Sequence, residues 1–360
     1  MEAGCAAEFL RFGHEAFRAV TSIVAPSKAA ATGHRSARTA RLAASAGEWS
    51  RYVGLRVGQA LIALLGVTTA VFFVLRLTGD PAQLLAPQGA SQLDISNLRA
   101  QLGLDKPVFD QYLSFLQGLS HGDLGFSYVQ HQSALVLISE RLPYTLFLAS
   151  WALVISAVFG VGAGMIMALY RGRVGERVLM PLVLIGQAMP AFWTGIILIL
   201  VFSVALHVLP SSGYSGVTSL IMPAITLASL SAATIARVTR SAVLEQLSKD
   251  YVRTARAKGA GATRLICIHL MRNVSIPIIT VLALETANLL GGSVITEMIF
   301  AWPGVGQLTI QSVSSRDFPV VQAVVILAAT TYILINFAAD VLYGFIDPRV
   351  SAMISSRKAA

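Results

Sequence analysis

Charged side chains are scarce in this chain. Asp, Glu, Lys and Arg make up only 12% of its 360 residues, whereas hydrophobic residues make up 55% and the mean hydropathy is +0.69. An ordinary soluble domain carries roughly 25% charged residues. The composition therefore argues against a soluble globular protein and predicts one that crosses a membrane several times.

Cysteine is also rare, and the sequence has no recognisable metal or nucleotide motif. Cys5 and Cys267 are the two cysteines, and with a few scattered histidines they show no spacing typical of metal ligands. We expect no disulfide between them, because both fall on the side predicted below to be cytoplasmic. No segment fits the phosphate-binding pattern G-x-x-x-x-G-K-[ST], so we expect no nucleotide or other cofactor in this chain.

Six apolar runs are each long enough to cross a bilayer. A helix needs about 20 residues to span the roughly 30 Å hydrocarbon core. Prolines inside these runs are compatible with membrane helices, since neighbouring helices can satisfy the freed backbone groups. We therefore predict an all-α polytopic membrane protein with six transmembrane helices, over Val57–Leu75, Leu142–Leu169, Val178–Ala205, Ser219–Ala236, Ile276–Phe300 and Val320–Phe345.

Lys and Arg are concentrated in four parts of the sequence: Met1–Arg56, Arg171–Arg177, Arg237–Arg272 and the tail after Phe345. With six spans, all four parts fall on the same side of the membrane. Loops rich in Lys and Arg stay in the cytoplasm, so this side, with both termini, is predicted to be cytoplasmic. The net charge of +9 then reflects topology. No nucleic-acid partner is expected, because the sequence shows no soluble basic domain.

The sequence divides into two tails and one membrane domain. Residues 1–50 are predicted to form a cytoplasmic N-terminal tail, partly disordered because its second half is small, polar and basic. The alternative for this Arg-rich tail is an organellar transit peptide. Residues 51–350 form the predicted membrane domain, and residues 351–360 form a short C-terminal tail.

Two segments of the membrane domain are predicted to lie outside the bilayer on its outer face. The insert at residues 78–141 contains two expected amphipathic helices, Leu93–Leu102 and Pro107–Leu116, with a proline in the first turn of the second. This insert either caps the outer ends of the helices or forms a docking surface. The second segment begins at Trp302–Gly306 and is predicted to be an outer loop that ends near Asp317.

Residues 237–275 are predicted to form a cytoplasmic loop. This loop contains most of the most distinctive stretch of the chain, Tyr251–Pro277. Four apolar residues follow a helical stripe: Leu244, Leu247, Tyr251 and Ala255. Basic residues are concentrated in the last turn of this helix, where positive charge is favoured. Gly259 is expected to adopt the left-handed backbone conformation that ends the helix. A second helix is predicted after Gly261. Because small residues surround the break, we favour a docking element over a basic loop that only enforces topology.

The pattern Ala255…Gly259…Ile268…Pro277 resembles the cytoplasmic coupling-loop signature of the permease subunits of binding-protein-dependent ABC importers. The first position departs from that signature, which often opens with Glu-Ala-Ala where this chain has Arg-Thr-Ala. The stretch YVRTARAKG is similar to the dipeptide/oligopeptide branch in particular.

Further segments, in the same order along the chain, agree with that branch, and the resemblance covers roughly Arg51–Val350. The segments are LRLTGDPA (Leu75–Ala82), LRAQLGLDKPVFDQYLSFL (Leu98–Leu116), GDLGFS (Gly122–Ser127), ERLPYTL (Glu140–Leu146), FAWPGVG (Phe300–Gly306) and DPR (Asp347–Arg349).

The resemblance implies the type I ABC importer permease fold and a location in the bacterial plasma (inner) membrane. It also implies that Ala255–Ile268 form a short coupling helix in a groove of an ATP-hydrolysing subunit, with Gly259 permitting close approach. The residues assigned to this coupling role are Tyr251, Ala255, Lys258, Gly259, Ala260, Arg264, Ile268 and Pro277.

The implied function is that of a non-catalytic subunit that moves di- or oligopeptides inward by alternating access. Besides membrane lipid, the implied partners are a second homologous permease subunit, two ATP-binding subunits that hold ATP and Mg, and an extracytoplasmic substrate-binding protein. Members of this branch also carry nickel chelates, haem or glutathione, so these remain alternative substrates.

Three acidic residues lie within the predicted spans: Glu285, Glu297 and Asp340. A charge at the bilayer centre costs at least about 2.5–3.5 kcal/mol, so each should face the helix bundle or a wet cavity. Glu297 could line an outer gate or bind a peptide amine, or it could be a buried residue bonded to neighbouring backbone. The candidates for a gate or substrate path are Glu297, Glu285, Asn288 and Trp302.

Aromatic residues near the span ends have a simpler interpretation as anchors at the membrane interface. These residues are Phe192, Trp193 and Trp302.

Two other classes of function remain as alternatives. A proton-coupled secondary transporter would need a relay of intramembrane acids with cationic partners, and three scattered acids make a poor relay. A polytopic membrane enzyme would need His, Asp or Ser clustered at one membrane face, and the sequence shows no such cluster.

Overall fold

The computed structural model describes residues 34–77, 82–83, 91–101 and 103–346. Most of the predicted N-terminal tail and all of the C-terminal tail lie outside the described residues. So does Cys5, and with it the expectation that Cys5 and Cys267 stay unpaired. Asp340 belongs to a described helix, but its side chain is outside the description.

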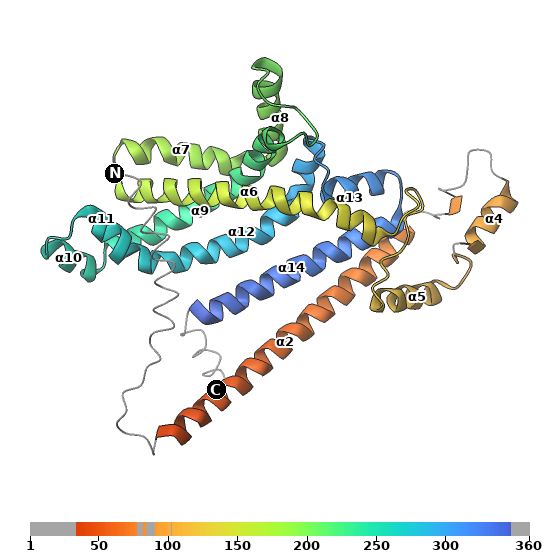
Figure 1. Ribbon diagram of the computed structural model, residues 1–360, viewed down its shortest axis with the longest axis horizontal. Helices are drawn as coiled ribbons and strands as arrows, with labels where there is room; N and C mark the ends of the chain where they lie inside the picture. Colours follow the sequence, from red (N-terminus) through yellow and green to blue (C-terminus); the bar gives the residue numbers. More distant parts are fainter. Residues whose placement is uncertain (1–33, 78–81, 84–90, 102, 347–360) are drawn as a thin grey trace. The chain divides into compact units, whose positions relative to one another are not determined.

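Helices joined by loops and turns form the described part of the chain, together with one isolated antiparallel bridge between Phe126 and Ser133 (Figure 1). The helices are α2 (His34–Leu77), α4 (Gln92–Gln101), α5 (Val108–Ser120), α6 (Ala134–Leu169), α7 (Val174–Ala188), α8 (Ala191–Leu198), α9 (Val217–Leu247), α10 (Asp250–Ala257), α11 (Ala262–Arg264), α12 (Met271–Ile299), α13 (Val305–Ser314) and α14 (Phe318–Ile346), with π-helical segments η1 (Ile199–Ala205) and η2 (Leu265–Leu270). The predicted all-α class is confirmed.

Five of the predicted spans are long apolar helices. The segments able to cross a bilayer are Gly54–Leu77, Ala134–Leu169, Val217–Leu247, Leu265–Ile299 and Phe318–Ala338. The first helix, α2, begins at His34, so residues 34–50 are helical, although they were expected to belong to a partly disordered tail. Alanine and arginine, which are frequent there, both have high helix propensity.

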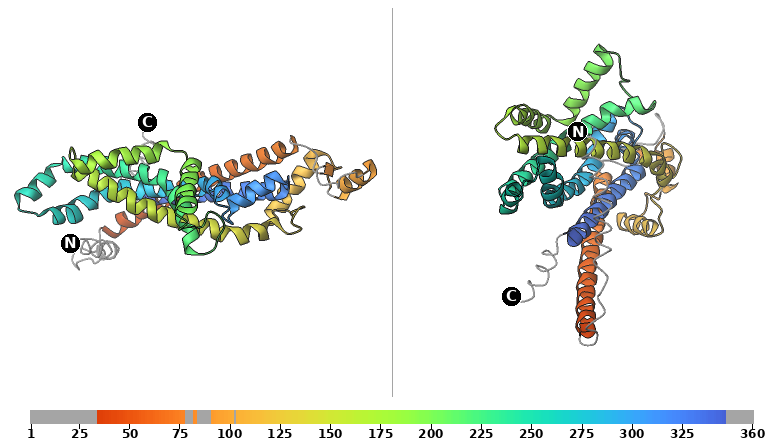
Figure 2. Two further views of the ribbon diagram at one scale, coloured as in Figure 1. Left: turned by 90° about the horizontal axis from the view of Figure 1, so that it is seen from above. Right: turned by 60° about the vertical axis from the view of Figure 1, so that its left-hand side comes forward.

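The predicted span Val178–Ala205 is not one straight helix, because the chain bends within it. The helical stretches Val174–Ala188 and Ala191–Ala205 meet at an angle of 108°, and Figure 2 shows α8 turned away from α7. Proline disfavours helical geometry in the residue before it, and both Met189 and Pro190 are extended, with ψ of 126° and 141°. The described residues thus contain five helices long and apolar enough to cross a membrane, or six such spans if the bent pair counts as one.

The chain divides into two compact units, residues 1–61 with 241–277 and residues 62–240 with 278–360. Within the larger unit, α6 packs against α7, α13 and α14 (Figures 1 and 2). One buried apolar cluster joins the start of α6 to α13 and α14: Ala134, Leu137, Ile138, Val305, Leu308, Val320, Ala323 and Val324. A second joins the middle of α6 to α9 and α12: Leu148, Ala152, Leu220, Ala224, Leu227, Ala228, Leu289 and Trp302.

Two glycines set the distance between α6 and α9. A Cβ at Gly160 would lie 2.8 Å from the carbonyl oxygen of Ala232, and one at Gly164 would lie 2.5 Å from that of Ala236. Small residues let membrane helices approach until their backbones touch, which increases van der Waals contact where lipid offers no hydrophobic driving force. The four-residue spacing of the glycines therefore makes α6 and α9 one closely packed pair.

The segments predicted to lie outside the bilayer are partly as expected. The two short helices of the insert are confirmed as α4 and α5, with Pro107 at the N-cap of α5 instead of in its first turn. The expected loop between Trp302–Gly306 and Asp317 is wrong, because α13 occupies most of it. Apolar residues of α13 are buried against α6 and α14, and this packing stabilises a helix that is too short and too polar to be recognised as a span.

Candidate functional site

The basic segment (Tyr251–Pro277) contains the helix, glycine turn and second helix that were predicted. α10 ends at Ala257, and Gly259 then adopts φ of +79°. The amide of Ala260 donates a hydrogen bond to the carbonyl oxygen of Ala255 at 3.1 Å, which closes the helix end. Since the left-handed region is costly for residues with a Cβ, the glycine is needed for this turn.

The helix before the glycine is shorter than its apolar stripe suggested. α9 ends at Leu247, and Lys249 is extended with ψ of 150° before α10 begins at Asp250. An acidic residue in the first turn favours a new helix start. The stripe is therefore interrupted, and its members Leu244, Leu247, Tyr251 and Ala255 are only half-buried.

The apolar residues that hold this segment together were not singled out from the sequence. α10 packs against η2, and the buried side chains there are Val252, Leu265 and Leu270. Val252 and Tyr251 are neighbours in the sequence. Only the packing of α10 on η2 shows which of these two residues is buried between the helical stretches. Tyr251 instead donates its hydroxyl to Oε1 of Gln246 at 2.9 Å.

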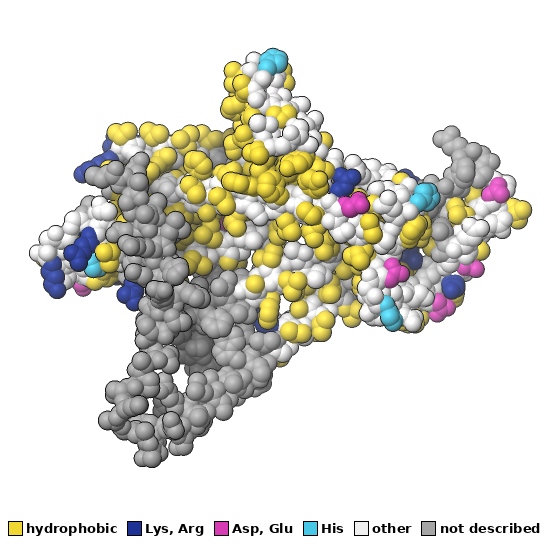
Figure 3. Space-filling model, viewed as in Figure 1, with side chains coloured by type: hydrophobic (Ala, Val, Ile, Leu, Met, Phe, Trp, Pro, Cys, Tyr) yellow, Lys and Arg dark blue, Asp and Glu magenta, His cyan; other side chains and the backbone are white. Residues whose placement is uncertain are grey.

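The remaining predicted coupling residues surround an open surface. Four of them are exposed: Lys258, Gly259, Arg264 and Ile268. The other two are half-buried, Ala260 in the turn and Pro277 within α12. A Cβ built on Gly259 or Gly261 would meet no described atom within 4 Å. Figure 3 shows Lys and Arg side chains gathered over α10 and α11. This surface is basic, carries several small residues and is left open by the described part of the chain.

Glu297 occupies a buried polar site where α12, α6 and α13 meet. Its Oε1 accepts a hydrogen bond from the Thr145 hydroxyl at 2.8 Å. Its Oε2 accepts from the amides of Gly306 and Gln307 at 2.7 and 3.2 Å, and the amide of Val305 donates to Thr145 Oγ1 at 2.8 Å. The first amides of a helix lack intrahelical partners and favour negative charge. The side chain of Glu297 thus caps α13, which matches its interpretation as a buried residue bonded to backbone.

Two glycines of the Trp302–Gly306 turn make room for this carboxylate. A Cβ at Gly304 would lie 2.3 Å from Glu297 Oε2, and one at Gly306 would lie 2.6 Å from the Cα of Val294. Trp302 is fully buried, and its indole NH donates to the carbonyl oxygen of Tyr144 at 3.0 Å. Its predicted role as an interface anchor is therefore wrong.

The other intramembrane candidates lie elsewhere on α12. Glu285 is buried, and its Oε2 accepts a hydrogen bond from Ser231 of α9 at 2.6 Å, whereas Asn288 is exposed. Glu285 and Glu297 are about 18 Å apart along the helix at 1.5 Å per residue. The structure therefore brings Trp302 to Glu297 but does not gather all four candidates into one site.

An ion pair joins the start of α7 to α9. Arg240 Nε donates to Glu176 Oε1 at 3.0 Å, and Arg240 Nη2 contacts the same oxygen. The amide of Gly172 donates to the second carboxylate oxygen at 2.6 Å. Arg240 lies on the helix that leads to the basic segment, so the pair fastens that helix to the turn between α6 and α7.

Reversing one charge of this pair should impair the protein, and reversing both should restore it. We expect Glu176→Arg and Arg240→Glu each to lower the yield and the unfolding temperature of the protein, because each places two like charges in contact. The double variant re-forms an ion pair in which the acidic and the basic residue have exchanged positions. Thermal unfolding in detergent, together with the yield of purified protein, is the measurement. A double variant as impaired as the worse single variant would contradict the role of the pair.

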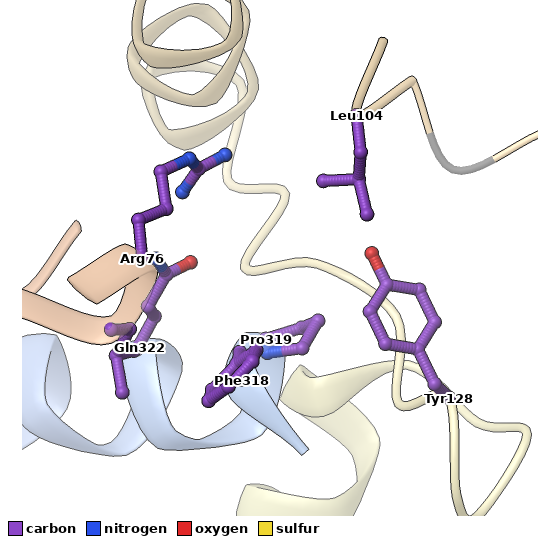
Figure 4. A pocket seen from close by; sticks show the side chains of 7 residues that line it. Arg76, Leu104, Tyr128, Phe318, Pro319 and Gln322 are labelled. Carbon is purple, nitrogen blue, oxygen red and sulfur yellow. The ribbon is translucent and has the colours of Figure 1, made fainter. Parts of the chain in front are cut away.

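A small cavity lies between the end of α2 and the start of α14. It measures about 70 Å³ and is lined by Leu75, Arg76, Leu104, Tyr128, Phe318, Pro319 and Gln322 (Figure 4). Burial, followed by the nearby Asp317 carboxylate, raises the pKa of Tyr128, and the Arg76 charge partly opposes this shift. Pockets for small molecules measure about 300–1,000 Å³, so this cavity is too small for a ligand of that kind.

No group of three or more His, Cys, Asp or Glu side chains in the described ranges could hold a metal ion.

Comparison with known families matches most of the chain. Residues 160–352 match the family described as the binding-protein-dependent transport system inner membrane component, and residues 50–149 match the N-terminal part of such a membrane component.

Relatives with known roles are similar over nearly their whole length. The di/tripeptide transport system permease protein DppB of Pseudomonas aeruginosa is 39% identical over 332 residues, covering 83% of this chain and 98% of the relative. The glutathione transport system permease protein GsiC of Escherichia coli K12 is 41% identical over 300 residues, with the same coverage.

Solved structures share the fold at lower identity. An inward-facing MetNI methionine ABC transporter matches with a TM-score of 0.52 and 20% identity, over 59% of this chain and 97% of the solved one. A second crystal form of MetNI matches with a TM-score of 0.51 and 21% identity, over 59% and 96% of the two chains.

Proposed function

The chain belongs to the family of binding-protein-dependent transport system inner membrane components and is therefore a permease subunit of an ABC importer. From this premise we propose that it carries di- or oligopeptides. The observation that carries the proposal is the near full-length identity with permeases for di- and tripeptides and for glutathione, itself a tripeptide. Glutathione is the nearest alternative substrate, and nickel chelates and haem are more distant ones.

For the topology, we propose six spans with both termini in the cytoplasm. The bent pair of α7 and α8 with η1 would then cross the membrane as one broken span. Broken helices are tolerated at membrane depth where protein or a wet cavity surrounds the break. This count puts the basic segment and the Arg171–Arg177 turn on one side, as the distribution of Lys and Arg favours.

For coupling, we propose that the basic segment docks in a groove of an ATP-binding subunit. The left-handed turn at Gly259 and the open space around Gly259 and Gly261 support this role. The basic side chains and the exposed Ile268 provide polar and apolar contacts on the same surface. ATP-driven closure of the partners would move this segment and reorient the helices between outward and inward access.

The complete importer in this proposal contains further subunits. A second homologous permease subunit, two ATP-binding subunits and an extracytoplasmic binding protein complete it, and ATP and Mg bind to the partner ATPases. The permease itself catalyses no reaction and binds no nucleic acid. Within this division of labour, the substrate range depends largely on the binding protein.

Uptake by the reconstituted importer tests this function. We expect labelled di- or tripeptide to accumulate in proteoliposomes only with ATP and the binding protein, and uptake to continue when a protonophore collapses the proton gradient. An ATPase-dead partner is the control. Uptake that follows the proton gradient without ATP would instead support a secondary transporter, and competition by excess glutathione would identify that tripeptide as a substrate.

A further inference from the structure

The apolar face of α5 is wider than the part that the rest of the described chain covers. On one side of the helix, Tyr112 and Phe115 pack against Phe72 of α2, with ring centroids 5.1 and 5.5 Å apart. On the adjoining side, Phe109 and Leu113 are 65% and 47% exposed. Residues four apart lie on the same helix face, so Phe109 and Leu113 form one strip that the described residues leave largely exposed.

Hydrogen bonds fix α5 to the membrane-spanning part of α2. The hydroxyls of Thr69 and Tyr112 are 2.6 Å apart, and Arg76 Nη2 donates to Gln111 Oε1 at 2.5 Å. Thr69 and Arg76 belong to the span Gly54–Leu77. Figures 1 and 2 show α5 beside the Leu77 end of that helix.

The depth of these contacts indicates what lies beside α5. Thr69 is about 12 Å from the Leu77 end of α2, at 1.5 Å per residue. Helices at a membrane surface bury their apolar face about 5–10 Å into the boundary between headgroups and acyl chains. Tyr112 therefore meets α2 below the end of the span, at a depth where α5 is beside lipid.

The neighbouring surface of α2 and the character of the contact residues agree with this depth. Phe73, Val74 and Leu77 of α2 are 42%, 55% and 86% exposed, as expected of side chains that face acyl chains. The guanidinium of Arg76 lies 3.6 Å from the centre of the Phe72 ring. Long basic side chains and tyrosines are typical of the membrane–water interface, because they join an apolar body to a polar tip.

We propose that α5 is an interfacial helix, with the strip formed by Phe109 and Leu113 immersed in the acyl chains of the leaflet at the Leu77 end of α2. Asp110 and Ser114 are exposed and lie about 100° around the helix from this strip, at 3.6 residues per turn. They face the headgroups and water. The insert is then held by the bilayer as well as by α2, and in the proposed topology the leaflet is the outer one.

Site-directed spin labelling tests the proposal in the assembled importer in nanodiscs. Cysteines replace Phe109 and Leu113 on the strip, or Asp110 and Ser114 as matched controls, in a chain carrying Cys5→Ser and Cys267→Ser. We expect labels on the strip to be several-fold more accessible to oxygen, relative to a water-soluble nickel chelate, than labels on the controls. Equal ratios at all four positions, or a strip that favours nickel, would overturn the proposal.

A second measurement keeps the native cysteines. A photoreactive benzoylphenylalanine in place of Phe109 should give adducts with lipid, detected by mass spectrometry of the chain after illumination in nanodiscs. Adducts with the second permease subunit or the binding protein, in place of lipid, would show that a protein covers the strip and would overturn the proposal. The same residue at Ser114 is the control, for which we expect at most a trace of lipid adduct.

Discussion

A bulky side chain at position 259 should lower both binding-protein-stimulated ATP hydrolysis and transport. Gly259→Leu should reduce binding-protein-stimulated ATP hydrolysis by roughly tenfold or more, the ratio that corresponds to about 1.4 kcal/mol. Two effects contribute. The left-handed turn costs a residue with a Cβ about 1–2 kcal/mol, and the side chain would occupy the open space where we propose the partner subunit docks. Stimulated ATPase activity and uptake of the purified importer are the measurements.

Two further variants separate strain from bulk. Asparagine tolerates the left-handed region better than other residues with a side chain, so Gly259→Asn keeps the turn but adds a group to the surface. Gly261→Ala adds a methyl group nearby at a residue without positive φ. If Gly259→Asn retains full stimulation, the glycine is needed only for the turn and the proposed close approach is wrong. If Gly261→Ala alone loses activity, the contact centres on the other glycine.

Removing the Glu297 carboxylate should strongly destabilise the protein. Glu297→Ala leaves the amides of Gly306 and Gln307 and the hydroxyl of Thr145 without their acceptor in a buried site. Each buried group left without a partner costs about 1–3 kcal/mol. We expect a lower unfolding temperature and a reduced yield of assembled importer, measured by thermal unfolding in detergent.

Glu297→Gln distinguishes this capping role from contact with substrate. The amide keeps one acceptor oxygen but replaces the other oxygen with a donor, which faces the donor groups of α13 or of Thr145. A capping role therefore predicts a lowered unfolding temperature with an unchanged KM for peptide uptake. A raised KM in a protein of unchanged stability would instead place Glu297 in the substrate path.

Local signals in the sequence account for much of the fold. Five spans follow from the length of their apolar runs, because any helix of that length and composition can satisfy its backbone within the bilayer. The insert helices α4 and α5 follow from short periodic patterns next to Pro107. Gly259 marks a turn because glycine adopts positive φ at little cost. Each of these features depends on residues close together in the chain.

The bend after α7 and the helix α13 illustrate what such signals leave open. Composition identifies Val178–Ala205 as apolar but carries no information about direction, and Pro190 is compatible with a kinked span or with a sharp turn. α13 has no long apolar run. Its helix is stabilised by packing on α6 and α14 and by a carboxylate at its start.

The sequence by itself determined that this protein is a helical membrane protein and where its basic segment breaks, since hydropathy, charge and a glycine turn act over a few neighbouring residues. Its role as a permease subunit followed from its resemblance to a family. Only the tertiary structure decided the partners of its buried and half-buried polar groups. Glu297 meets Thr145 across 152 positions, and Glu176 meets Arg240 across 64. A buried carboxylate needs donors wherever packing supplies them, and packing brings together residues that no local pattern connects.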